Sequence, residues 1–167
     1  MILAKKECYF FYLFLPLNKV FLGCETLVMI IINREKVVSA ADISILKQEM
    51  KSFYNTQLKG KTVKNKQKGI SILFSSVGRN HILYARAVGF EKLIAITKLA
   101  EMVREAKYSN FKEADENDSK DILGYMNFKV GVCINDEMCY FRIVVRLTKN
   151  GKYFYDHSVK IRKTDTH

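Results

Sequence analysis

The sequence lacks the features of several protein classes. Its 167 residues contain no Trp, one Pro and eight Gly. This scarcity of Pro and Gly, in a chain that is 49% hydrophobic, excludes a collagen-like, linker-like or intrinsically disordered protein. The four cysteines form neither a CxxC pair nor a Cys/His group with zinc-ligand spacing, and no glycine-rich phosphate loop is present. We therefore expect one globular domain with reduced thiols, no metal and no cofactor.

Positive charge is in excess and unevenly distributed. The 28 Lys and Arg residues outnumber 17 Asp and Glu residues, which gives a net charge of +11. Residues 34–68 hold nine Lys and Arg against three Asp and Glu, and residues 128–167 hold eight against four. Between them, residues 107–127 hold three against five. Charge of this kind indicates an anionic partner and says nothing about the fold.

The first basic region ends in a run of closely spaced lysines. They are Lys59, Lys61, Lys64, Lys66 and Lys68. Small and polar residues separate them, so the run predicts a solvated loop. Contact with the phosphates of a nucleic acid is the functional alternative for the same loop.

The first 35 residues are apolar and admit three interpretations. Residues 8–17 form an aromatic-rich run behind two lysines, which is the layout of a short signal peptide. Lys19 and Glu25 interrupt the run before it reaches the roughly 18–20 uncharged residues of a membrane-spanning helix. The interpretations are an additional packed strand or helix, a weak signal or lipid anchor within residues 1–24, and an extension outside the domain. The second implies export; otherwise we expect a cytoplasmic protein that does not associate with a membrane.

Hydrophobic periodicity predicts two helices from residue 36 onward. Ser39 and Asp42 have capping-box spacing, and apolar residues then recur from Ile43 to Leu58, which predicts an amphipathic helix of about 18 residues. A second helix is predicted over residues 90–106 on the same grounds. Residues 75–81 are expected to form a polar turn, and residues 113–121 an acidic surface loop.

Strands of one sheet are predicted both before and after the second helix in the sequence. Residues 70–74 read as a short strand, and from Ile122 onward the hydrophobic period changes to two. Hairpin signals at Asn135–Glu137 and Asn150–Gly151 divide that last region into three strands. The predicted fold class is therefore α+β, with two amphipathic helices packed on one face of a mainly antiparallel four-stranded sheet. It fills residues 36–162 as a single domain and leaves residues 163–167 as a tail.

The last hairpin predicts which side chains share a face of the sheet. A two-residue loop at Asn150–Gly151 pairs Arg146 with Tyr155, Val144 with His157 and Thr148 with Tyr153. One face then collects mainly basic and aromatic side chains, namely Asn127, Lys129, Tyr140, Arg142, Arg146, Tyr153, Tyr155 and His157. Asp156 is expected on the opposite face, where it could not orient His157.

This face has two interpretations. Antiparallel sheets commonly leave one face in water, where Arg, Lys and Tyr are ordinary residues. Alternatively the face binds nucleic acid, because arginines bind phosphate, tyrosines stack on bases and a histidine can exchange a proton. His81, in the polar turn beside Arg79, is a second candidate for proton exchange.

Several segments, in order, resemble a known kind of domain. They are Leu58–Lys61, Val63–Asn65, Gly69–Ile72, the turn 75–81, Lys98–Val103 with the following Ala106–Tyr108, and Tyr153–Ser158. They resemble small domains of large polyvalent proteins from phages and conjugative elements, which are assigned to the barnase/EndoU/colicin/RelE superfamily of metal-independent ribonucleases. The resemblance covers about residues 36–162. It implies helices that precede a four-stranded antiparallel sheet.

The resemblance also implies site residues. The family's closing segment matches Tyr155 and His157, its arginine-bearing strand matches Arg142 and Arg146, and its turn matches Arg79 and His81. It implies a toxin-like ribonuclease of mobile-element origin that cleaves RNA by general acid/base catalysis, with a cognate inhibitor protein as a further partner. Arg79, Lys129, Tyr153 and the five lysines would bind the nucleic acid. The alternative is a non-catalytic module of the same fold that binds nucleic acid or protein.

Overall fold

The computed structural model describes residues 19–22, 25–37, 39–84 and 88–161. Most of the expected signal or anchor, and the tail 163–167, lie outside the described residues. The helical segments are α1 (Ala40–Phe53), the π-helix η2 (Tyr54–Leu58), α2 (Ser76–Leu83), α3 (Phe90–Ile94), the 3-10 helix η3 (Ala95–Lys98) and α4 (Leu99–Glu105). The strands are β1 (Lys19–Leu22), β2 (Glu25–Val28), β3 (Ile30–Ile32), β4 (Thr62–Lys64), β5 (Ser71–Phe74), β6 (Lys107–Glu113), β7 (Ile122–Ile134), β8 (Glu137–Thr148) and β9 (Tyr153–Ile161).

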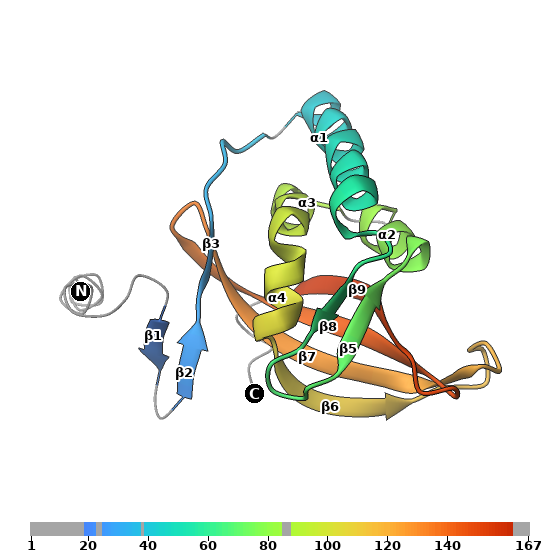
Figure 1. Ribbon diagram of the computed structural model, residues 1–167. Coiled ribbons are helices and arrows are strands. Elements are labelled where there is room, and N and C mark those ends of the chain that lie inside the picture. The colour runs from blue at the N-terminus through green and yellow to red at the C-terminus, as the bar shows by residue number, and fades with distance from the viewer. Residues whose placement is uncertain (1–18, 23–24, 38, 85–87, 162–167) are drawn as a thin grey trace.

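Seven of the strands form one mixed sheet (Figure 1). Its order is β3-β7-β8-β9-β5-β4, and β6 also pairs with β7. The pairs β3–β7 and β5–β9 are parallel, and the other pairs are antiparallel. The prediction of a mainly antiparallel four-stranded sheet is therefore wrong. It left out β4 and β6, because β4 has only three residues and β6 is exposed along nearly its whole length, so neither shows a clear apolar alternation. Strand β3 lies in the first 35 residues, for which an additional packed strand was one of three interpretations.

The helices form three units instead of the predicted two. The first begins where it was predicted, with the Ser39 hydroxyl accepting a hydrogen bond from the backbone N–H of Asp42 (3.1 Å). The segment predicted as one helix over residues 90–106 is α3, η3 and α4 in succession. The predicted polar turn at residues 75–81 is wrong, since helix α2 begins at Ser76.

The core lies between the sheet and the helices α1, α3 and α4 (Figure 1). Alternate residues of β7 and β8, such as Phe128, Phe141 and Val145, are buried in it together with Leu93 and Met102 from the helices. The opposite, outer face of β7, β8 and β9 carries four of the basic residues predicted there. They are Lys129, Arg142, Arg146 and His157. Among the described residues, no helix is both long and apolar enough to cross a membrane.

Candidate functional site

The centre of the site is an irregularity in β9. Val144 of β8 pairs with His157, whereas Val145 pairs with Tyr155, so Asp156 is an extra residue in β9. Such a β-bulge sets two consecutive residues opposite a single residue of the neighbouring strand. The Asp156 and His157 side chains consequently approach each other to 2.7 Å. A regular strand would direct them to opposite faces.

Helix α2 brings a second histidine to the bulge. Ser75 caps the helix, because its hydroxyl accepts a hydrogen bond from the backbone N–H of Gly78. Gly78 lies so close to β9 that a Cβ atom there would be 2.4 Å from the carbonyl oxygen of Tyr155. His81 follows three residues later and therefore shares the helix face of Gly78. The missing side chain of Gly78 lets α2 approach until His81 reaches Asp156.

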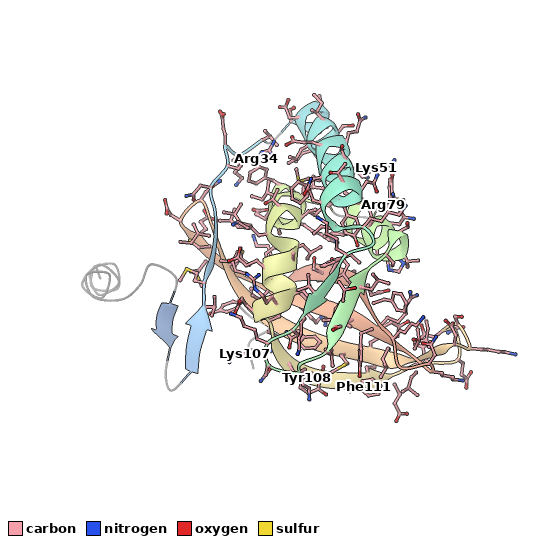
Figure 2. The ribbon with its side chains drawn as sticks, in the orientation of Figure 1. Arg34, Lys51, Arg79, Lys107, Tyr108 and Phe111 are labelled. Carbon is pink, nitrogen blue, oxygen red and sulfur yellow. The ribbon has the colours of Figure 1, made fainter. Side chains whose placement is uncertain are left out.

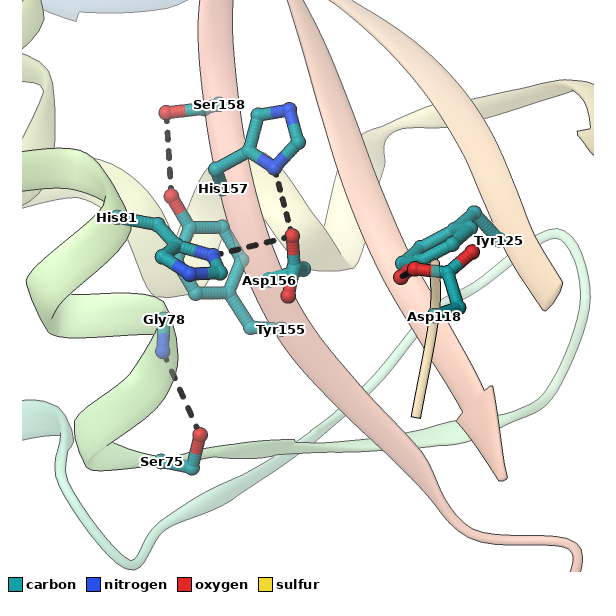
Figure 3. Close-up of polar contacts among 9 residues, drawn as sticks. All are labelled: Ser75, Gly78, His81, Asp118, Tyr125, Tyr155, Asp156, His157 and Ser158. Carbon is teal, nitrogen blue, oxygen red and sulfur yellow. Dashed lines mark hydrogen bonds and ion pairs between the residues drawn. The ribbon is translucent and has the colours of Figure 1, made fainter. Parts of the chain in front are cut away.

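Asp156 joins the two histidines (Figure 3). Its Oδ2 lies 2.7 Å from Nδ1 of His157 and 3.3 Å from Nδ1 of His81. An ionised carboxylate only accepts hydrogen bonds, so each Nδ1 donates and each neutral imidazole keeps its lone pair on Nε2. The Asp156 side chain is 8% exposed, whereas those of His81 and His157 are 50% and 33% exposed. A buried carboxylate thus orients two accessible imidazoles.

The charge of Asp156 is stabilised by these contacts. Burial by itself raises the pKa of the Asp156 carboxyl, but the hydrogen bonds and positive charge of His157 and His81 outweigh it. The net result is a pKa below the ordinary value of 3.8. Asp156 is therefore ionised at neutral pH and accepts a hydrogen bond from each imidazole.

The outer face of β7, β8 and β9 arranges the neighbours of this cluster in three rows. The Arg146 row consists of the paired residues Tyr125, Arg146 and Phe154; the His157 row of Asn127, Val144 and His157; and the Arg142 row of Lys129, Arg142 and Val159. Residues two positions apart on a strand share a face, so the rows are adjacent. Arg142 and Arg146 therefore lie on the face of His157, as predicted, one row to either side.

The two arginines have different surroundings. Arg142 and its neighbour Lys129 are exposed. Arg146 is half-buried, and its guanidinium carbon lies 5.4 Å from the ring centre of Phe154. The Nε of Arg146 is buried and has no hydrogen-bond partner in the described part of the chain. A half-exposed guanidinium that pairs with no carboxylate of the described residues is suited to binding an anion.

Two tyrosines expected on this face are on the core side. Tyr155 is fully buried, and its hydroxyl donates a hydrogen bond to the Ser158 hydroxyl (3.2 Å). Tyr153 also packs against the core. Phe154, which the sequence did not single out, occupies the outer face in their place.

Tyr153 and Tyr155 lie on the core side because of the geometry of the last hairpin. Thr148 N–H bonds to the carbonyl oxygen of Lys152 (3.0 Å), so the loop has three residues, with Gly151 at a positive φ of 77°, instead of two. This shifts the register by one residue at Tyr153–Tyr155, and the bulge at Asp156 shifts it back at His157. The predicted positions of Tyr153, Tyr155 and Asp156 were therefore wrong, whereas the pairing of Val144 with His157 is confirmed.

Part of the predicted lysine loop lies at another end of the molecule. The buried Asn65 donates hydrogen bonds to two carbonyl oxygens at the end of α4 (2.8 Å each) and fixes the turn between β4 and β5 there. Lys66 pairs with Glu105 at 2.5 Å, and Lys68 lies 4.0 Å from the ring centre of Tyr108. Figure 2 shows Tyr108 by the start of β6, far from α2. Lys64, Lys66 and Lys68 are thus not brought together with the histidines.

The remaining predicted residues lie nearer α2 but outside the cluster. Lys59 and Lys61 are exposed and flank Gly60, whose N–H bonds to the carbonyl oxygen of Phe74. Arg79, on α2 (Figure 2), donates to the Asn55 side chain at 2.7 Å and to its neighbour Asn80. Arg79 therefore ties α2 to η2 and does not contact Asp156.

The cluster also brings three atoms of metal-ligating type within 4.8 Å of one another, from His81, Asp156 and His157. Spacing along the chain does not predict this set, because His81 and Asp156 are 75 residues apart and Asp156 was expected on the other face. Both Nδ1 atoms lie at hydrogen-bonding distance from one carboxylate oxygen. This is the arrangement of a hydrogen-bonded acid–base cluster.

Residues 41–155 match the model of a protein family described as large polyvalent protein-associated domain 3. The chain belongs to this family. The match runs from α1 to Tyr155, so the polyvalent domain includes His81 and both arginines and ends one residue before Asp156. No curated protein and no solved structure matches the chain significantly. Membership confirms the polyvalent-protein context that the sequence resemblance implied, and it specifies no chemistry.

Proposed function

We propose that this polyvalent protein-associated domain is a metal-independent endoribonuclease of the barnase/EndoU/colicin/RelE type. The observation that supports it is the buried Asp156 carboxylate bonded to two accessible imidazoles on a face with two arginines. Cleavage of RNA without a metal needs a base, an acid and cations at the phosphate. The outer face of β7–β9 and the adjoining α2 offer all three.

In the proposed reaction, Nε2 of one imidazole takes the proton of the ribose 2′-hydroxyl. The 2′-oxygen then bonds to the adjacent phosphorus as the bond from phosphorus to the 5′-oxygen breaks. The other imidazole, protonated beforehand, gives its proton to the leaving 5′-oxygen. The products are a 2′,3′-cyclic phosphate and a 5′-hydroxyl. Asp156 holds both rings through Nδ1 and thereby directs each Nε2 outward.

The arginines supply the charge that the reaction requires. Negative charge grows on the phosphate oxygens as the 2′-oxygen attacks, and guanidinium groups stabilise it through paired hydrogen bonds. Arg146 and Arg142 flank the His157 row on opposite sides. Tyr155 has no direct part in this proposal, because its hydroxyl is buried against Ser158.

The first prediction concerns His157→Ala. Purified protein is incubated with total RNA, with and without EDTA, and fragments are followed on denaturing gels. Wild-type protein is expected to cut RNA equally in both conditions. His157→Ala removes one of the two proton carriers and is expected to lower the rate about 100-fold or more. His81→Ala is expected to have an effect of the same order.

Lys152→Ala is the matched control, since Lys152 is an exposed cation just before β9 and outside the three rows. It should cut at the wild-type rate. If His157→Ala also does so, the catalytic proposal fails. Loss of cleavage in EDTA would instead assign a metal to the cluster. Binding of RNA that weakens with salt, without cleavage, would support the non-catalytic binding module.

A further inference from the structure

The acidic segment between β6 and β7 reaches the Arg146 row of the sheet face. Residues 113–121 contain five Asp and Glu and one Lys. The backbone N–H of Ala114 bonds to the carbonyl oxygen of Leu123 (3.2 Å), and that of Lys149 bonds to the carbonyl oxygen of Asp121 (2.8 Å). These bonds anchor the segment at the start of β7 and beside the last hairpin. The segment is therefore a fixed part of the fold, next to the outer face.

One carboxylate of this segment binds a side chain of the Arg146 row. The Tyr125 hydroxyl, which lies beside Asp118 in Figure 3, donates a hydrogen bond to Oδ1 of Asp118 at 2.5 Å. Oδ2 of Asp118 accepts a hydrogen bond from the backbone N–H of Asp115 at 2.9 Å. The Tyr125 hydrogen bond lowers the pKa of Asp118, and the negative charge of Asp156 acts on both residues. The Tyr125 donor thus holds a negatively charged oxygen acceptor close to the catalytic cluster.

The neighbour of Tyr125 in the same row has an unused donor. Arg146 pairs with Tyr125 across β7 and β8, and its buried Nε is unpaired in the described part of the chain. Phe154 lies against the guanidinium and restricts its position. Asp121 acts on Arg146 only through its charge, since no hydrogen bond joins them. The Tyr125 phenol, which is hydrogen-bonded to the Asp118 carboxylate, therefore lies beside the Arg146 guanidinium, which has no carboxylate of the described residues bonded to it.

We propose that Tyr125 and Arg146 form a subsite for a phosphodiester group of a nucleic-acid strand, and that Asp118 occupies the Tyr125 donor when no strand is bound. The inference rests on the proposed function, because the strand must cross the His157 row to be cut. A phosphodiester oxygen and a carboxylate oxygen are acceptors of the same kind and charge, so they compete for the Tyr125 hydroxyl. The subsite lies one row from His157, so the phosphate that Tyr125 binds flanks the reacting phosphate, to which Arg146 also donates.

The test measures binding without cleavage. The probe is a fluorescent single-stranded 2′-O-methyl RNA, which lacks the attacking hydroxyl, and its Kd is measured by anisotropy at fixed salt. Asp118→Asn keeps an acceptor for Tyr125 but removes the competing charge, and it is expected to lower Kd about fivefold. Glu116→Gln removes the same charge from an exposed residue of the same segment, and it should change Kd by less than about twofold.

Two further variants test the donors themselves. Adding Tyr125→Phe to Asp118→Asn should reverse most of the gain, because the phenol donor is then missing. Arg146→Gln in the otherwise wild-type chain should weaken binding about tenfold, which keeps the subsite testable even if Asp118→Asn fails to fold. Equal effects of Asp118→Asn and Glu116→Gln, or an unchanged Kd in Arg146→Gln, would overturn the subsite.

These outcomes are separate from those of the cleavage assay. If RNA is not cut but Asp118→Asn binds the probe more tightly and Arg146→Gln more weakly, the subsite stands and the ribonuclease proposal fails. If RNA is cut but Asp118→Asn and Glu116→Gln bind the probe alike, the ribonuclease stands and the subsite fails.

Discussion

At the scale of single residues, Asp156 determines what the site can do. It is a buried carboxylate, and its pKa is lowered by His157 and His81, whose side chains are partly exposed. The same residue would be an unremarkable acid on either face of a regular strand. Its effect on His157 arises because the bulge directs two neighbouring side chains to one side. Its effect on His81 arises because Gly78 brings α2 into contact with β9.

Asp156→Asn is predicted to change how stability depends on pH. Since the pKa of Asp156 in the folded protein lies below its ordinary value of 3.8, the ionised carboxylate stabilises the native state above that pH, and the contribution is lost as the pH falls through the folded pKa. Asp156→Asn is expected to cost about 1–2 kcal/mol at neutral pH. Its free energy of unfolding, measured with urea from neutral pH into acid, should decline less than that of wild-type protein.

Glu116→Gln provides the comparison for this prediction, because Glu116 is exposed in the acidic segment. Its stability should follow that of the wild-type protein at every pH. An Asp156→Asn variant with the same decline in acid as wild type would show that Asp156 carries no such contribution.

At the scale of elements, the contact between α2 and β9 assembles the site. Gly78→Ala is predicted to disturb it, because the added Cβ would lie 2.4 Å from the carbonyl oxygen and 2.7 Å from Cδ1 of Tyr155. Tyr155 is fully buried in the sheet and has no room to move. We expect a loss of about 1–3 kcal/mol in urea unfolding, although alanine is the better helix former. RNA cleavage should fall as well, since His81 moves away from Asp156.

Gly89→Ala is the matched substitution for this test. The nearest atom to its added Cβ is a carboxylate oxygen of Glu91 at 3.5 Å, an ordinary contact. It should change the free energy of unfolding by less than about 1 kcal/mol and leave cleavage unchanged. Equal losses in the two variants would mean that the close approach of α2 to Tyr155 is unimportant.

The elements that sequence predicts are those with local signals. The helix after Ser39, the long strands β7 and β8 and the hairpin at Asn135–Asp136 depend on capping, alternation and positive φ, which neighbouring residues specify. Strands β3 and β4 are too short to carry such a pattern, and the pairing of β3 with β7 joins distant segments. Helix α2 was missed because Gly78 and Asn80 favour a turn, whereas packing against β9 favours a helix.

The site was predictable only where it depends on the local alternation of the strands. Arg142, Arg146 and His157 were expected on one face and lie there. His157 was placed correctly because the extra loop residue and the bulge cancel, which the sequence does not reveal. The position of Asp156 depends entirely on that bulge, and a bulge leaves no periodic signal in nine residues of strand.

At the scale of the whole molecule, the positive charge does not form one continuous surface. The lysine turn 65–69 is fixed beside α4 and β6, and Glu105 neutralises part of it through Lys66. The outer face carries its own cations in the Arg142 and Arg146 rows, with the acidic segment at one end. The excess of +11 is thus divided between at least two regions, and only one of them lies next to the imidazoles.

The chain N-terminal to α1 also belongs to the whole-molecule architecture, because β3 extends the sheet beyond β7. Ile30 is 1% exposed and pairs with Val132, whereas its neighbour Ile31 is 39% exposed. Ile30→Ala is predicted to cost about 2–4 kcal/mol in urea unfolding, because it leaves a cavity in the core. Ile31→Ala, the same change one residue along on the solvent side, should cost less than about 1 kcal/mol. Both variants should still cut RNA where they remain folded, since β3 and the histidines lie on different parts of the sheet. Equal costs for the two substitutions would mean that β3 does not contribute a buried face to the domain.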